Sequence, residues 1–260
     1  MINGCRRLGV QVKTTADKSL QSTLTWALGR MKGKGFVITS SVSLSIDPKL
    51  AIMGYAKKEG NSHKIVISDW ALDSDMLGGL VLHELAHIYF TEKGAHSHDS
   101  ESLERLLQSM KEQDGLRAKE VENLVDAYNH LQNILVDDVV FTVMEGKELD
   151  VARRFFSEWI SDRPSGDPVL DASLLCRNAF AIASLKRRHL LQKDDEMNYR
   201  NKGFISAMGE FSEKEFDWLE GFLESAKNEW SEREFLAAME EYLERVMSLM
   251  RPEAKLADLR

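Results

Sequence analysis

The sequence predicts an α+β protein with a small mixed β-sheet near the N-terminus and a mainly α-helical C-terminal half. Short segments that are rich in β-branched residues, or that alternate apolar with polar residues, fall before residue 70. Apolar residues at helical spacing dominate after residue 73. A chain of 260 residues, with 43% hydrophobic and 29% charged residues, is long enough to bury one large core or two modest ones.

The N-terminal segments show strand and helix signals in turn. We expect a strand at 8–13, a helix at 17–31, a strand at 36–46 and a hairpin that joins 50–56 to 63–68. The turn of this hairpin is predicted from the run Lys58 to Asn61, which contains Gly60. These segments together form the predicted sheet and one helix that accompanies it.

The rest of the chain is predicted to be helical. The first helix follows a cap at Asp73 or Ser74 and is almost wholly apolar, so it should be buried. Further helices are expected at 102–111, 118–144, 171–192, 212–228 and 231–250, the last two opening with the capping boxes Ser212–Glu215 and Ser231–Glu234. Two prolines at 161–168 mark a linker, which predicts domains at 1–160 and 161–260. The basic run 186–189 is expected to be a solvated helix face, with an anion site as the less favoured alternative.

Composition limits the classes of partner. The chain carries 34 Lys and Arg against 42 Asp and Glu, a formal net charge of -8, which argues against binding to nucleic acid or to an anionic membrane. No window approaches about 18 uncharged apolar residues, so we expect no membrane span. Cys5 and Cys176 are far apart and match no metal-ligand spacing, and a reducing cytoplasm is the expected compartment.

The strongest chemical signal is the sequence His83-Glu84-Leu85-Ala86-His87 inside the apolar helix. Residues four apart lie on the same face of a helix, so both imidazoles can reach one Zn²⁺ ion at about 2.0–2.1 Å. Glu84 then lies beside the metal and can take a proton from the water that attacks the substrate. Two His and one Glu in an otherwise apolar helix need partners, and a metal site supplies them.

A catalytic zinc ion needs a third protein ligand. Asp126, His130, Asn133 and Asp137 form one polar stripe on the helix predicted at 118–144. Asp137 is the preferred ligand, with Asn133 or His130 orienting its carboxylate.

Other third ligands stay open. Glu122 is the main rival, because Glu122 to Asp126 spells E-x-x-x-D, which resembles the third-ligand motif of gluzincin peptidases. Asp138 projects about 100° from Asp137 around the helix. The loop residues His96 and His98 are further alternatives.

Two blocks of sequence resemble the zincin-type metallopeptidases, in particular the metallopeptidase-like domain associated with cobaltochelatase-type and von Willebrand A proteins and their phage relatives. The blocks are residues 83–92 and the segment Asn133-Ile134-Leu135-Val136-Asp137, which looks like that family's N-x-x-E-D segment with Val136 in place of the Glu. The resemblance covers about residues 36 to 145. It implies a zincin-like fold, in which the small sheet packs on the active-site helix, and an edge strand that pairs with extended substrate. The strand at 63–68 takes that edge role in this interpretation, and a hairpin that only packs in the core is the open alternative.

The sequence therefore predicts a cytoplasmic zinc metallopeptidase that acts on a peptide or protein substrate. His83, His87 and Asp137 bind zinc, and Glu84 is the catalytic base. The alternative is a catalytically inactive module in which zinc stabilises the fold and the acidic helical C-terminal half engages a protein partner. This alternative predicts metal-dependent stability without turnover.

Overall fold

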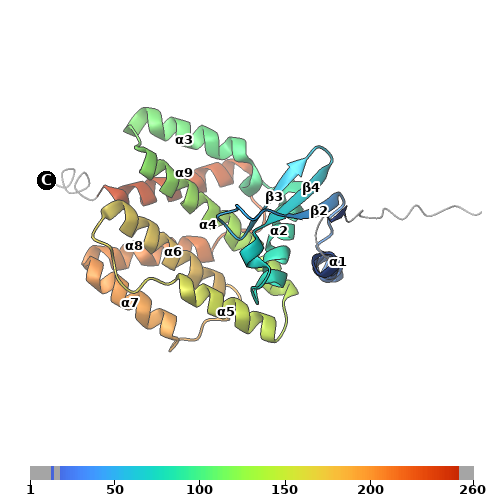
Figure 1. Ribbon diagram of the computed structural model, residues 1–260. Coiled ribbons are helices and arrows are strands. Elements are labelled where there is room, and N and C mark those ends of the chain that lie inside the picture. Colours follow the sequence, from blue (N-terminus) through green and yellow to red (C-terminus); the bar gives the residue numbers. More distant parts are fainter. Residues whose placement is uncertain (1–12, 15–17, 252–260) are drawn as a thin grey trace, which may run out of the picture. The chain divides into compact units, whose positions relative to one another are not determined.

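The computed structural model describes residues 13–14 and 18–251 and shows a mixed α+β protein that is mostly helical (Figure 1). The chain divides into two compact units. Unit 1 holds the described residues up to Lys93 together with Val139–Val151, and unit 2 holds Gly94–Asp138 together with the described residues from Ala152 onward. The linker at 161–168 lies within unit 2 and connects two of its helices.

Unit 1 is built on a mixed sheet whose described strands have the order β1-β2-β4-β3. β1, β2 and β4 run parallel to one another, and β3 runs antiparallel to β4. The strands are β1 (Lys13–Thr14), β2 (Ser41–Ile46), β3 (Gly54–Glu59) and β4 (Ser62–Ile67). The strand expected at 8–13 lies outside the described residues apart from Lys13, as does Cys5.

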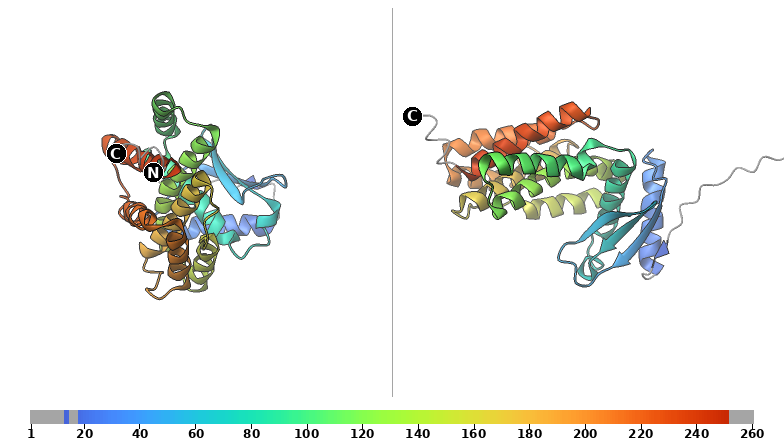
Figure 2. Two further views of the ribbon diagram at one scale, coloured as in Figure 1. Left: turned by 90° about the vertical axis from the view of Figure 1, so that its left-hand side faces the viewer. Right: turned by 90° about the horizontal axis from the view of Figure 1, so that it is seen from above.

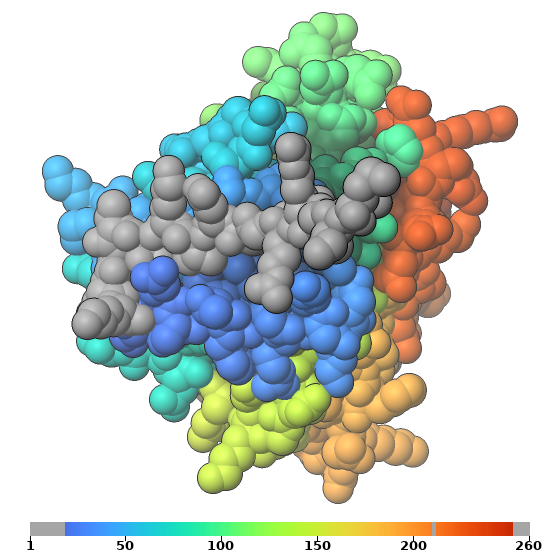
Figure 3. Space-filling model, turned by 90° about the vertical axis from the view of Figure 1, so that its right-hand side faces the viewer, coloured from blue at the N-terminus to red at the C-terminus, as the bar shows by residue number. Residues whose placement is uncertain are grey.

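One face of this sheet is apolar because side chains alternate along each strand. Val42, Leu44, Ile65 and Ile67 share the buried face, while serines of β2 occupy the other. Two helices, α1 (Lys18–Gly33) and α2 (Leu77–Glu92), pack on the apolar face. Figure 3 looks onto the α1 side of this unit. The coarse prediction of a small sheet packed on the motif helix is thus confirmed.

The β3–β4 hairpin was predicted with shifted bounds. Its two-residue turn is Gly60-Asn61, and Gly60 has φ +62°, the left-handed conformation that a type II′ turn needs at its first central residue. At its other end, β3 begins at Gly54 rather than at residue 50. The edge role assigned to 63–68 is wrong, because β4 lies between β2 and β3, and of the two hairpin strands it is β3 that lies at an edge of the sheet. Position in the sheet depends on which strand pairs with β2, and the local pattern does not encode this.

Unit 2 is helical, and its helices lie side by side in both views of Figure 2. Its helices are α3 (Ser100–Asp114), α4 (Ala118–Val143), α5 (Lys147–Trp159), α6 (Pro168–Lys186), α7 (Glu196–Met208), α8 (Glu210–Glu224) and α9 (Glu232–Met250), preceded by a short 3-10 turn, η2 (His96–His98). The last turn of α4 and the first of α5 belong to unit 1. α5 and α7 were not predicted from the sequence.

Helix ends were the weakest predictions. α2 begins at Leu77 with Met76 as its cap, so neither Asp73 nor Ser74 caps it, and a second 3-10 turn, η1 (Asp69–Ala71), precedes it. The capping box Ser231–Glu234 is confirmed. The box at Ser212 is wrong, because α8 already begins at Glu210.

α6 is the central helix of unit 2. Asp167 caps it through bonds from the backbone N–H groups of Val169 and Leu170, and 13 of its 19 residues are buried. Within the described part of the chain it is the one helix long and apolar enough to cross a membrane, with 72% of the apolar window buried. A buried core helix has the same length and composition, so this is weak evidence for a span.

Candidate metal centre

The motif helix α2 is held close to its neighbours by its first turn. A Cβ atom at position 78 would lie 3.2 Å from the Trp26 ring, and one at position 79 would lie 2.6 Å from the Met144 methyl group, so Gly78 and Gly79 leave room for both neighbours. Leu80, one residue further, packs on Gly54 of the edge strand. The paired glycines, which weaken a helix, therefore permit the close packing of α2 within unit 1.

His83 and His87 lie on one face of α2, as their spacing predicts. Their Nε2 atoms are 3.2 Å apart, and the ring centroids are 4.8 Å apart with the rings at 73° to each other. Two nitrogen ligands at about 2.0–2.1 Å from a tetrahedral zinc ion are about 3.3–3.4 Å apart. The two nitrogens thus have the spacing of a zinc-binding pair, and the chemistry of this donor set fits zinc.

Glu84 lies between the two histidines in sequence and is 5% exposed. Its carboxylate lies near the backbone N–H of Ala56 in β3, which favours the charged form. Burial raises the pKa of Glu84 above its ordinary value, while His83 and the Ala56 N–H oppose that rise. A carboxylate with a raised pKa is a better proton acceptor near neutral pH than an exposed one.

The register of the hairpin places Glu84 beside the open edge of the sheet. Ser68 N–H donates to Met53 O at 2.9 Å, and this bond sets which residues face β4. In an antiparallel ladder, hydrogen-bonded pairs alternate with pairs that are not hydrogen-bonded. Tyr55, Lys57 and Glu59 therefore exchange backbone hydrogen bonds with β4. The backbone N–H and C=O groups of Gly54, Ala56 and Lys58 point away from β4, toward the open edge. The Ala56 N–H therefore approaches Glu84 on the side where a further strand would pair. Sequence reasoning missed this contact.

The far end of α2 is fixed by Glu92. Its carboxylate accepts bonds from the Thr39 backbone N–H and hydroxyl and from the Ser40 N–H, at 2.7–2.9 Å. These bonds lower the pKa of Glu92 although burial opposes them. The residue that closes the block 83–92 thus ties the motif helix to the segment before β2.

The candidates for a third ligand belong to unit 2. Asp137 is buried, and its Oδ2 accepts a hydrogen bond from Ser184 Oγ of α6 at 3.0 Å. A hydrogen-bonded carboxylate of this kind is typical of metal ligands. Sequence reasoning named Asn133 or His130 for this orienting role and missed Ser184.

His130 has a different surrounding from the one expected. Its ring stacks on Phe180 at 4.9 Å, and burial lowers its pKa to about 4, with a smaller effect from Arg177. The ring is thus a neutral packing group of unit 2.

Asp138 has its own partners. Arg187 and Arg188 both bind its carboxylate, and Arg187 also donates to the backbone oxygens of Glu224 and Ala226. The expectation that 186–189 is a solvated helix face is therefore wrong. α6 ends at Lys186, and the two arginines after it join α4 to the end of α8.

The remaining candidates lie on the outside of unit 2 or in its 3-10 turn. Glu122 is exposed. His98 Nδ1 lies 3.0 Å from the Ser97 hydroxyl, and His96 begins the same turn. Over residues 13–14 and 18–251, no three His, Cys, Asp or Glu side chains are grouped so as to hold a metal ion. The histidine pair is therefore the part of the predicted centre whose geometry is described.

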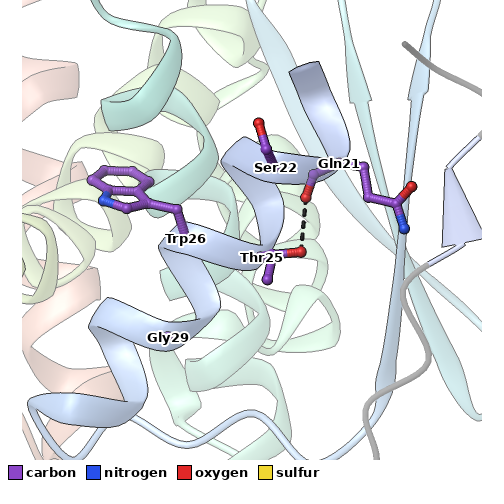
Figure 4. A pocket seen from close by; sticks show the side chains of 5 residues that line it. All are labelled: Gln21, Ser22, Thr25, Trp26 and Gly29. Carbon is purple, nitrogen blue, oxygen red and sulfur yellow. Dashed lines mark hydrogen bonds between the residues drawn. The ribbon is translucent and has the colours of Figure 1, made fainter. Parts of the chain in front are cut away.

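Two hollows of unit 1 lie away from the motif. One runs along the outer face of α1, where the Thr25 hydroxyl is bonded to the Gln21 carbonyl at 2.8 Å (Figure 4). The other has a volume of about 350 Å³. It is lined by Trp26, Asp75, Met76, Gly78, Gly79, Met144, Lys147, Glu148 and Val151. Neither contains a motif residue.

Comparison with known proteins places the chain in a family. No curated protein and no solved structure matches it. A family model described as "Family of unknown function (DUF5781)" matches residues 37–203, which is well over half of the chain and runs from before β2 into α7. The matched range includes the motif helix and every third-ligand candidate. The chain therefore belongs to the DUF5781 family of unknown function.

Proposed function

We propose that this protein is a zinc-dependent metallopeptidase with a zincin-like arrangement of sheet and motif helix. The observation that carries the proposal is the pair of Nε2 atoms of His83 and His87, 3.2 Å apart on a helix whose intervening Glu84 is buried. This spacing suits two nitrogens that share one metal ion, and in metal-free protein it suits a hydrogen bond between the two rings.

Each residue has a distinct role in this proposal. His83 and His87 hold zinc, and Asp137, oriented by Ser184, supplies the third ligand. When bound there, zinc would supply a Lewis acid for the scissile carbonyl and would lower the pKa of a water molecule to about 7. Glu84 accepts the proton of the attacking water and passes it to the leaving amine.

The edge of the sheet offers a place for the substrate. Gly54 and Lys58 of β3 direct backbone groups to the side where Ala56 meets Glu84. An extended peptide that added to this edge would gain backbone hydrogen bonds and pass beside the Glu84 carboxylate. This replaces the assignment of the substrate strand to 63–68.

The test is the zinc content of purified wild-type protein and of His83→Ala, Asp137→Ala and Glu122→Ala, followed by a peptidase screen. We expect one zinc ion per chain, lost in His83→Ala and Asp137→Ala and kept in Glu122→Ala. Thermal unfolding of each variant in EDTA separates loss of a ligand from loss of fold. Wild-type protein that takes up no zinc after reconstitution would overturn the proposal, and zinc that raises stability without any turnover would favour the interaction module.

A further inference from the structure

The open edge of β3 has two chemically different ends. The strand precedes β4 in a hairpin, and within the described part of the chain no other strand pairs with its outer side. Residues 50–53 lead into it and the turn Gly60-Asn61 ends it. At about 3.3 Å per residue, the six residues of β3 span about 17 Å from Gly54 to Glu59.

The end where β3 begins is apolar. Ile52 is 55% exposed and Trp70 is 53% exposed, and both belong to the small set of large apolar side chains that are exposed among the described residues. The indole N–H of Trp70 donates to the Leu50 carbonyl at 3.4 Å, so the ring is tied to the segment that enters β3. A fixed, exposed aromatic ring is a low-entropy contact for an apolar side chain.

The other end is basic. Lys57 and Lys58 are exposed, and Lys64 lies opposite Lys57 on β4. Lys57 pairs with Glu59 at 2.9 Å. Lys58, by contrast, makes no ion pair among the described side chains, and it shares the face of Ala56, beside Glu84. The net charge of this end is therefore positive in a chain whose net charge is -8.

We propose that the β3 edge selects extended peptide segments that carry acidic side chains for Lys58 and a large apolar side chain for Ile52 and Trp70. This inference rests on the proposed function, since it names the substrate class of the same site. Antiparallel pairing is the more stable arrangement, so the peptide runs opposite to β3. Its acidic residues then lie toward its N-terminus and its apolar residue toward its C-terminus.

The experiment measures binding apart from hydrolysis. Full-length wild-type protein in EDTA is titrated into the fluorescein-labelled peptide Glu-Glu-Ala-Ala-Leu-Phe, and anisotropy is recorded. The comparison peptides are the reversed sequence Phe-Leu-Ala-Ala-Glu-Glu, the basic sequence Lys-Lys-Ala-Ala-Leu-Phe, and an N-methylated copy of the first that cannot donate to the edge. We expect each to bind at least threefold more weakly than the first.

Variants assign the two ends. Lys58→Glu should weaken binding of the acidic peptide at least threefold and improve that of the basic one, and Trp70→Ala should weaken both about tenfold. Lys32→Glu, a matched charge reversal on the exposed end of α1, should change neither. Equal binding of all peptides, or no effect of Lys58→Glu, would overturn the inference and leave the lysines as protection of an open sheet edge.

Hydrolysis is then assayed with the zinc-loaded protein and the same peptides. Selective binding without cleavage would sustain this inference and overturn the peptidase proposal. Cleavage without preference among the peptides would sustain the peptidase proposal and overturn this inference.

Discussion

Two buried glutamates, one in each unit, show how differently a carboxylate can be held. Glu120 of unit 2 is 0% exposed and accepts bonds from Arg251 at 2.7 and 2.8 Å and from the Arg117 side chain at 2.8 Å. Glu84 of unit 1 is 5% exposed and has one backbone N–H, that of Ala56, near its carboxylate. The first carboxylate has its charge matched by two guanidinium groups, and the second does not.

The two environments move the pKa in opposite directions. Bonds from Arg251 and then Arg117 lower the pKa of Glu120 well below its ordinary range, whereas burial raises the pKa of Glu84. A carboxylate with a matched charge stabilises a fold and is a poor base. A buried carboxylate with little compensation costs stability and is ready to take a proton, which is how many sites of chemistry are built.

The largest effect expected from this contrast is that of Glu84→Gln on turnover. An amide cannot accept the proton of the attacking water, so kcat should fall by about 10²–10⁴-fold. The zinc content should be unchanged, since Glu84 is not a ligand in the proposal. Steady-state kinetics on the peptide that the screen identifies, with zinc measured in the same samples, give the comparison.

The matched control is the same substitution in the other unit. Glu120→Gln should keep the turnover of folded, zinc-loaded protein, because Glu120 belongs to the ion pairs of unit 2. In zinc-free protein, Glu84→Gln should also raise the free energy of unfolding, because it removes a charge that burial disfavours. Turnover that survives in Glu84→Gln would exclude its role as the base.

Glu120→Gln tests the structural side of the contrast. Loss of the charge-assisted bonds from Arg251 and Arg117 should lower the free energy of unfolding by about 1.5–3 kcal/mol at pH 7. Because the folded-state pKa of Glu120 is depressed, its contribution is present above the unfolded-state pKa of about 4.3 and is lost as pH falls below it. Urea titrations at pH 7, 5 and 3 should show a difference that is constant at the first two values and smaller at the third. A difference independent of pH would show that the ion pairs are not its source.

Much of the fold was predictable because its signals are local. α4 was predicted at 118–144 and is observed at Ala118–Val143, since its apolar residues repeat at helical spacing without a break. The Ser231 capping box was predictable because its two members, Ser231 and Glu234, lie three residues apart in the sequence. The start of α2 was not, because Met76 caps it without a side-chain bond and so leaves no sequence signal.

What depends on tertiary pairing was not predictable. The order of β3 and β4 in the sheet, and hence the edge beside Glu84, follows from the pairing of β4 with β2. The roles of Arg187 and Arg188 follow from the approach of Asp138, which is about 50 residues earlier in the chain. In the candidate site, the spacing of His83 and His87 was encoded in the motif, whereas the bond from Ser184 to Asp137 joins two helices and has no local pattern.

Ser184→Ala has the smallest effect and separates the two uses of a buried carboxylate at Asp137. If Asp137 is a ligand, the hydroxyl of Ser184 orients it, and its loss should weaken zinc affinity about tenfold. If Asp137 is structural, the same change should lower the free energy of unfolding of zinc-free protein by about 1 kcal/mol and leave zinc affinity as it was. Ser248→Ala is the matched control, because its hydroxyl bonds to the Arg245 carbonyl of its own helix at 2.8 Å. Competition with a zinc chelator measures the zinc affinity, and urea unfolding in EDTA measures the free energy of unfolding. A loss of zinc affinity larger than that of Ser248→Ala would show that Asp137 serves the site, as Glu84 does in the proposal. A loss of stability alone would show that Asp137 is structural, like Glu120.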